Sequence, residues 1–296
     1  MRTLKRLSAL ALVVGISLCV PSLALASQKG HIPLTDAQIK AQVEHKVSEL
    51  DLGTSHVSVT VKDGVVTLSG TVPSAWIKQE AVDRARKADD VTSVVSELSV
   101  MKAESDDALA TEVANKVRRY VFYTVYDDVE GRVHDGVVTL TGMVTAPYKA
   151  TEIADLAARV HGVREVDNKI KTLPVSAFDD QLRFTIASRI YRDPLFWNYA
   201  IQANPPIHVV VENGRVTLTG VVNSEVERRK AESVARTTFG SFTVENKLRL
   251  DSEVRRPTHG TETGFRPTIQ DSKPWTRVVV DDLQNADGQS SESATR

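Results

Sequence analysis

The chain has 296 residues, enough for two or three domains, and its 41% hydrophobic and 25% charged residues are typical of globular protein. Its net charge of −1 gives no reason to expect a nucleic acid partner. Aromatic residues are sparse, at 5% of the chain.

Residues 1–26 are predicted to be a secretory signal peptide. Three basic residues precede an apolar run at 7–20, which is too short to span a membrane. Ala24-Leu25-Ala26 is a small-x-small cleavage site, so we expect cleavage after Ala26 and a periplasmic mature chain. A retained membrane anchor and a lipoprotein modified at Cys19 are the alternatives. Cleavage would remove the only cysteine.

One eight-residue motif occurs three times in the chain. It reads DGVVTLSG at 63–70, DGVVTLTG at 135–142 and NGRVTLTG at 213–220. Asp-Gly and Asn-Gly favour a two-residue hairpin, because glycine accepts the positive φ that such a turn needs. Before the first copy, Val57, Val59 and Val61 alternate with polar residues as in a half-buried strand. Three copies of one hairpin predict three copies of one small domain.

A predicted helix lies on each side of every hairpin. In the first copy, Ile39, Val43 and Val47 recur every four residues, behind a capping box of Thr35 and Gln38. Acidic residues open each first helix, where they suit the positive end of the helix dipole. With a final strand, the unit reads helix–strand–strand–helix–strand, so the predicted fold class is α+β.

The predicted domains cover residues 35–100, 106–173 and 179–250. The segment between first helix and first strand is longest in the third copy, and such insertions often lie on the binding face of a repeat. Residues 251–296 lose the apolar period and are predicted to be a disordered tail. Within that tail, residues 277–280 (RVVV) could form a short strand.

The repeat resembles the BON domain of bacterial osmotically inducible and nodulation proteins. The capped helix, the hairpin motif, the second helix and a V-x-N-x-[IL] strand at 166–170 and 244–248 carry this resemblance. It implies three tandem sandwiches, each a three-stranded mixed sheet with two helices packed on one face. The first copy departs from the pattern, with Ser96 in place of the asparagine. In the second copy Gly131 replaces a valine of the first strand, which predicts a bulge or bend there.

The resemblance also implies a role in the bacterial envelope. We expect a non-enzymatic, transport-associated exported protein that binds phospholipid surfaces peripherally and supports envelope integrity or the osmotic stress response. The expected partners are anionic phospholipid headgroups or envelope proteins. The alternative is a soluble periplasmic stress protein that binds exported or unfolded proteins, as a chaperone does.

No motif for catalysis, metal binding or cofactor binding is visible in the sequence. None of the seven histidines lies three or four residues from another, and H-E-x-x-H, G-x-S-x-G and a P-loop are absent. His56, His134 and His208 are interpreted as strand residues, and Asp127-Asp128 as part of a solvated loop. We therefore predict no enzyme, no cofactor, no metal site and no small-molecule substrate.

Aromatic residues gather in two stretches after the first helices, at 118–123 and 191–199. Tyrosine and tryptophan beside arginine suit a membrane interface or a protein contact, although such residues also pack in cores. Basic runs on the second helices offer a further surface for anionic headgroups, or a solvated face. The candidate contact residues are Arg118, Arg119, Tyr120, Tyr123, Tyr191, Phe196, Trp197 and Tyr199. The glycines of the repeated motif are interpreted as turn and close-packing positions, and the predicted turn glycines are Gly64, Gly70, Gly136, Gly142, Gly214 and Gly220.

Overall fold

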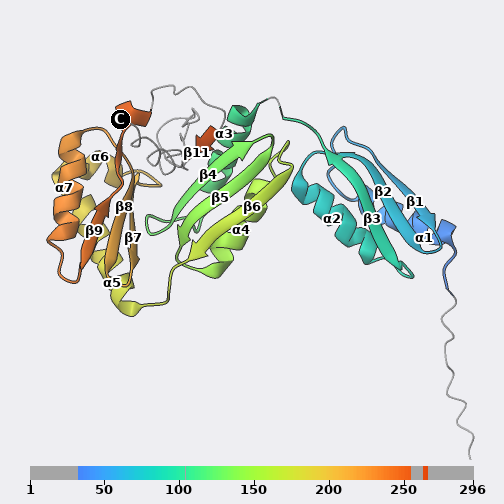
Figure 1. Cartoon of the computed structure of the whole chain (residues 1–296), viewed down its shortest axis with the longest axis horizontal. Helices are drawn as coiled ribbons and strands as arrows, with labels where there is room; N and C mark the ends of the chain where they lie inside the picture. The colour runs from blue at the N-terminus through green and yellow to red at the C-terminus, as the bar shows by residue number, and fades with distance from the viewer. Residues whose placement is uncertain (1–32, 104, 255–262, 266–296) are drawn as a thin grey trace, which may run out of the picture. The chain divides into compact units, whose positions relative to one another are not determined.

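The computed structural model describes residues 33–103, 105–254 and 263–265 (Figure 1). The predicted signal peptide, Cys19 and the RVVV segment lie outside these residues. Three α+β units follow one another along the described chain, each with its own hydrophobic core. They are called the first, second and third repeats.

The first two repeats share the predicted element order. The first consists of α1 (Asp36–Ser48), β1 (Val57–Lys62), β2 (Val65–Val72), α2 (Ala75–Arg86) and β3 (Ser93–Val100). The second consists of α3 (Asp106–Arg118), β4 (Asp128–His134), β5 (Val137–Val144), α4 (Pro147–Ala158) and β6 (Glu165–Thr172). The predicted α+β fold class is therefore confirmed.

The third repeat has the same order with two additions. It consists of α5 (Ala177–Tyr191), η1 (Pro194–Phe196), α6 (Trp197–Ala200), β7 (Ile207–Glu212), β8 (Arg215–Val222), α7 (Glu225–Arg236), β9 (Thr243–Asn246) and β10 (Arg249–Leu250). The short helices η1 and α6 fill the longest of the three links. The last strand is divided into β9 and β10, and Lys247 between them still donates its N–H to the Leu218 carbonyl of β8.

Each repeat places the hairpin at the centre of a mixed sheet. The first two strands pair antiparallel, and the second and third pair parallel, so that the order in the first repeat is β1-β2-β3. The two long helices of each repeat pack on the sheet (Figure 1). The bulge predicted at Gly131 is wrong, since β4 and β5 pair without interruption from Asp128↔Met143 to His134↔Val137. A glycine keeps both of its ladder hydrogen-bonding groups, so the missing side chain alone does not break the register.

The six predicted turn glycines fall into two groups. Gly64, Gly136 and Gly214 occupy the hairpin turns at φ of 73° to 74°. Gly70, Gly142 and Gly220 do not lie in turns: they are inside β2, β5 and β8 at φ of 112° to 121°. There the backbone of the neighbouring strand approaches so closely that a Cβ on Gly220 would lie 1.8 Å from the Pro206 carbonyl oxygen. The prediction of a turn at these three glycines is wrong, and they have the other role expected for glycines of the motif, which is close packing.

The aspartate that opens each first helix binds the hairpin turn. The Asp36 carboxylate accepts the N–H groups of Asp63 at 2.9 Å and Gly64 at 3.0 Å. Asp106 and Asp179 make the same pair of bonds to the turns of their own repeats. These residues therefore tie helix to hairpin, besides suiting the helix dipole.

Replacing Asp36 with alanine is expected to destabilise the first repeat by about 1–2 kcal/mol, because two charge-assisted hydrogen bonds at a half-buried site are lost. Hydrogen exchange of the first-repeat amides measures the effect. Glu44→Ala, which removes an exposed carboxylate paired with Lys40 from the same helix, is the control and is expected to change little. Equal exchange in the two variants would show that the bonds to the turn contribute nothing.

Part of the predicted tail is ordered. Residues Asp251–Val254 form α8, and Thr263–Phe265 form β11, which pairs antiparallel with β4. The second repeat therefore has the sheet order β11-β4-β5-β6. The loss of the apolar period did not predict this strand, because strand addition at a sheet edge depends on backbone hydrogen bonds rather than on an apolar stripe.

Candidate functional site

The link between α3 and β4 holds four of the predicted contact residues. Tyr123 is buried, and its hydroxyl accepts the Val129 N–H at 3.3 Å. Tyr120 donates its hydroxyl to Glu152 on α4. Burial, followed by this hydrogen bond, raises the pKa of Tyr120, so the phenol remains a neutral donor. Arg119 is exposed and Arg118 half-buried.

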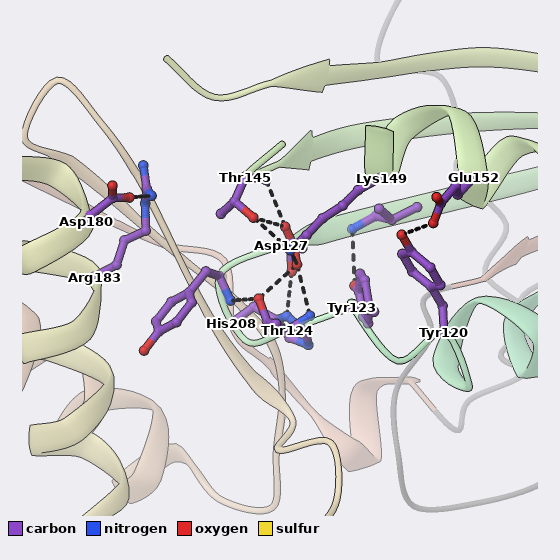
Figure 2. Close-up of polar contacts among 12 residues, drawn as sticks. Tyr120, Tyr123, Thr124, Asp127, Thr145, Lys149, Glu152, Asp180, Arg183 and His208 are labelled. Carbon is purple, nitrogen blue, oxygen red and sulfur yellow. Dashed lines mark hydrogen bonds and ion pairs between the residues drawn. The ribbon is translucent and has the colours of Figure 1, made fainter. Parts of the chain in front are cut away.

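Asp127 is fully buried at the end of this link and is paired with Lys149 of α4 (Figure 2). The Lys149 ammonium lies 2.7 Å from Asp127 Oδ2 and donates a second bond to the Thr145 hydroxyl. Thr124 donates its N–H and hydroxyl to Oδ2, and Thr145 donates its N–H and hydroxyl to Oδ1. With both oxygens saturated in this way, the buried charge is fully compensated.

This arrangement overturns the interpretation of Asp127-Asp128 as a solvated loop. Asp127 is inside because its partners come from the next hairpin and helix, far along the sequence. The signal that could have found it is Lys149, which occupies the apolar stripe of α4 with Ile153 and Ala157. A lysine on a buried helix face requires a buried acidic partner.

The same link is hydrogen-bonded to the third repeat. His208 of β7 places Nδ1 2.6 Å from the Asp127 carbonyl oxygen (Figure 2), and Val209 donates its N–H to the Val125 carbonyl at 2.7 Å. Val125 and Tyr126 pack against the core of the third repeat. The outer edge of β7 is therefore contacted by the turn at residues 124–127 of the second repeat. His134 and His208 are strand residues as predicted, and His56 lies immediately before β1.

Two of the cavities in the described structure are lined by residues of both the second and the third repeats. One of about 570 Å³ is lined by Arg118, Arg119, Tyr120 and Tyr123, together with His208 and residues 203–205. It brings the first predicted aromatic stretch together with the end of the third link. The other, of about 610 Å³, is lined by both acidic and basic side chains, and this mixture indicates no ligand class.

Three apolar side chains form an exposed patch beside the first cavity. Val121 is 83% exposed and Phe122 52% exposed, and Tyr148 at the start of α4 is also exposed. The Phe122 ring meets Tyr120 at 5.6 Å and Tyr148 at 6.1 Å, both edge to face. Residues 121, 122 and 148 are called the aromatic patch.

The comparison with known families follows the three units closely. The BON domain model matches residues 35–102, 105–174 and 179–252. This chain belongs to the BON domain family. Each repeat is thus one BON domain, and the resemblance drawn from the hairpin motif is confirmed.

Two named relatives share this family. Osmotically-inducible protein Y of Escherichia coli (strain K12) is 31% identical over 154 residues, which are 47% of this chain and 73% of that protein. Outer membrane lipoprotein DolP of Haemophilus influenzae is 31% identical over 145 residues, 47% of this chain and 67% of that protein. The solved structure of CdsD, a structural protein of the type III secretion system of Chlamydia trachomatis, is 19% identical. It covers 75% of this chain and 100% of its own, at a TM-score of 0.21, too low to support any inference.

The third BON domain keeps most of its predicted contact residues in the interior. Phe196 and Tyr199 belong to its core, and Tyr191 donates its hydroxyl to the Ile207 carbonyl at 2.5 Å. Burial raises the pKa of Tyr191, so it remains protonated. Of the four residues predicted in this stretch, Trp197 alone is exposed. Three of the four predicted contact residues of this stretch therefore pack inward, whereas Trp197 and its neighbour Leu195 are exposed.

The basic residues of the second helices are mostly paired. Arg84 of α2 lies within 3.1 Å of carboxylates on Glu80 and Glu49. In α7, Arg229 pairs with Glu225 at 2.9 Å and Lys230 with Asp193 at 3.1 Å. This pairing agrees with a solvated, mixed-charge face. Over the described parts of the BON domains, no helix is long and apolar enough to cross a membrane, and no group of histidine, aspartate or glutamate is placed to hold a metal.

Proposed function

We propose that this chain is an exported, non-enzymatic BON-domain protein of the bacterial envelope. It binds anionic phospholipid surfaces from one side and supports envelope integrity or the osmotic stress response. The family membership, the predicted signal peptide and the names of the two relatives support this proposal. One of those names refers to osmotic induction and the other to the outer membrane.

The observation that carries the proposal is the aromatic patch with its neighbouring arginines. Exposed Val121 and Phe122 would enter the headgroup region, where apolar and aromatic side chains are favoured. Arg119 is exposed two residues before Val121 and would meet anionic headgroups there. Val121 and Phe122 lie in the turn after α3 and Tyr148 at the start of α4, so the patch can make this contact without any of the buried tyrosines moving.

Replacing both Val121 and Phe122 with serine is expected to weaken binding to phosphatidylglycerol vesicles about tenfold or more, because two exposed apolar side chains no longer leave water. Arg119→Gln is expected to weaken it about fivefold, as one cation near an anionic surface contributes about 1 kcal/mol. Vesicle co-sedimentation measures both. Val226→Ser, which removes an exposed aliphatic residue from α7, is the control. Binding of the double variant at the control's level would contradict the proposed surface.

The second candidate function is binding of exported or unfolded chains, and the sheet edges favour it. β4 receives the added strand β11, and β7 receives the backbone of Val125. Across the described ranges no strand pairs with the corresponding outer edge of β1. An extended client chain could add there. Wild-type protein that does not bind vesicles but suppresses aggregation of an unfolded client in the absence of lipid would favour this candidate.

A further inference from the structure

Two loops that recur in every repeat join the first and second repeats. The strand–helix loop of the first repeat, residues 73–76, consists of the two residues between β2 and α2 and the first two residues of α2. The helix–strand loop of the second repeat, residues 161–164, lies between α4 and β6. Gly162 donates its N–H to the Pro73 carbonyl and Ala75 donates its N–H to the Val163 carbonyl, each at 2.8 Å. Around these two bonds, the Arg159 guanidinium lies 4.1 Å from the centre of the Trp76 ring.

The third repeat carries the same helix–strand loop without a partner. Its residues are 239–242, and Gly240 takes φ of 97° where Gly162 takes 90°. Among the described residues, neither the Gly240 N–H nor the Ser241 carbonyl is hydrogen-bonded. Those are the two groups that correspond to the Gly162 N–H and the Val163 carbonyl of the joined loop. The third loop therefore presents an unused donor and an unused acceptor in the same geometry.

Three phenylalanines surround this loop. Phe239 is 98% exposed and Phe242 is 74% exposed, and the Phe242 ring stacks on exposed Phe178 at 6.3 Å. In the other two repeats the positions of Phe239 and Phe242 hold polar residues, which are Asp89, Thr92, His161 and Arg164. A cluster of exposed phenylalanine on one repeat alone marks a contact surface.

The third repeat also retains a competent strand–helix loop, at residues 223–226. Glu225 supplies the N–H that Ala75 supplies in the first repeat, and exposed Val226 stands where Trp76 stands. In the second repeat the position of Ala75 is occupied by Pro147, which has no N–H to donate. The third repeat is thus the one repeat of the described chain in which both loops are complete and neither is bound.

We propose that copies of this chain associate head to tail through their third repeats. The helix–strand loop of one copy binds the strand–helix loop of a second copy, as the second repeat binds the first. The Gly240 N–H is donated to the Asn223 carbonyl, the Glu225 N–H is donated to the Ser241 carbonyl, and the phenylalanines cover Val226. Each copy offers one loop of each kind, so the contact is heterologous and extends to further copies rather than closing at a pair. A lipid surface would accept the phenylalanines but would not match the paired donor and acceptor.

Sedimentation velocity of residues 27–296 tests this contact. Two short loops form a small interface, which is expected to be weak, so the protein concentration is varied from about 10 to 500 µM. The wild-type sedimentation coefficient is expected to rise with concentration. Two variants are expected to remain monomeric: Phe239→Ser combined with Phe242→Ser, and Glu225→Pro. Proline is tolerated at Glu225 because this is the first residue of α7, as Pro147 is of α4. Glu225→Ala and Phe184→Ser are the controls and should associate, because they keep the N–H and the loop phenylalanines.

Mixing the two monomeric variants gives the sharpest result. Each retains the loop that the other has lost, so the mixture is expected to form one-to-one pairs and nothing larger. A monomeric wild type at every concentration would overturn the proposal. So would association that Glu225→Pro leaves intact, which would show phenylalanine surfaces packing on each other. Loss of vesicle binding in the phenylalanine variant, with a monomeric wild type, would assign the surface to lipid instead.

Discussion

Gly220→Ala is expected to lower the free energy of unfolding of the third BON domain by about 3 kcal/mol or more. A Cβ at this position would lie 1.8 Å from the Pro206 carbonyl oxygen, on a residue whose φ is 112°. Strands β7 and β8 would have to separate at the start of β7, where Gly220 pairs with Ile207, to relieve that overlap. Faster hydrogen exchange of the β7 and β8 amides, compared with wild type, measures the loss.

Gly53→Ala separates the overlap from the cost of a positive φ. Gly53 has φ of 54° and no atom within 4 Å of a Cβ position, so alanine there is expected to cost about 1 kcal/mol. If Gly220→Ala were no more harmful than Gly53→Ala, the close approach of the strands would not be the reason that the motif ends in glycine.

Lys149→Met is expected to destabilise the second BON domain by about 3–5 kcal/mol. The substitution leaves the Asp127 carboxylate, which is 0% exposed, without its cation, and an unpaired buried charge is costly. Because the Asp127 carbonyl and Val125 bind β7, exchange is expected to quicken in β7 as well as in β4. Hydrogen exchange of both strands, followed by mass spectrometry, gives the two effects in one experiment.

Lys169→Met is the matched control for this prediction. Lys169 pairs with Asp167 on an exposed strand surface, where such a pair contributes at most about 1 kcal/mol. If hydrogen exchange in Lys149→Met were no faster than in Lys169→Met, the buried Asp127–Lys149 pair would not hold the link between α3 and β4 in place.

The repeated architecture could be predicted from local signals. The Asp-Gly and Asn-Gly turns, the alternation of Val57, Val59 and Val61, and the spacing of Ile39 and Val43 each depend on neighbours a few residues away. Because three copies of these signals align in one register, each copy strengthens the prediction made from the others. The role of Asp36 as a ligand of the hairpin turn was hidden, because its partners lie 27 and 28 residues further along the chain.

The candidate site was harder to predict for the same physical reason. Aromatic content identified both 118–123 and 191–199 as candidates, but the two stretches differ in which of their side chains are buried. Phe196 and Tyr199 fill the core because η1 and α6 fold the longer link back onto the sheet, whereas the chain turns outward at Val121 and Phe122. Composition records which side chains are apolar and not which are covered.

The three BON domains share a scaffold and differ where the links differ. Position 149 illustrates this, since Lys149 of the second domain stands where the first has Ile77 and the third has Glu227. Ile77 packs in an apolar core, Lys149 neutralises a buried carboxylate, and Glu227 accepts the Tyr199 hydroxyl at 2.7 Å. The same position of the second helix thus contacts a different link in each domain. The exposed surfaces of the three domains can therefore differ although the scaffold is shared.

Co-sedimentation of residues 27–296 with phosphatidylglycerol vesicles, at low and then rising salt, tests the proposed envelope function most directly. The protein is expected to pellet with the vesicles at low salt and to be partly released as salt screens the arginines, while the apolar contact of the aromatic patch persists. Protein that remains in the supernatant at low salt would contradict phospholipid binding.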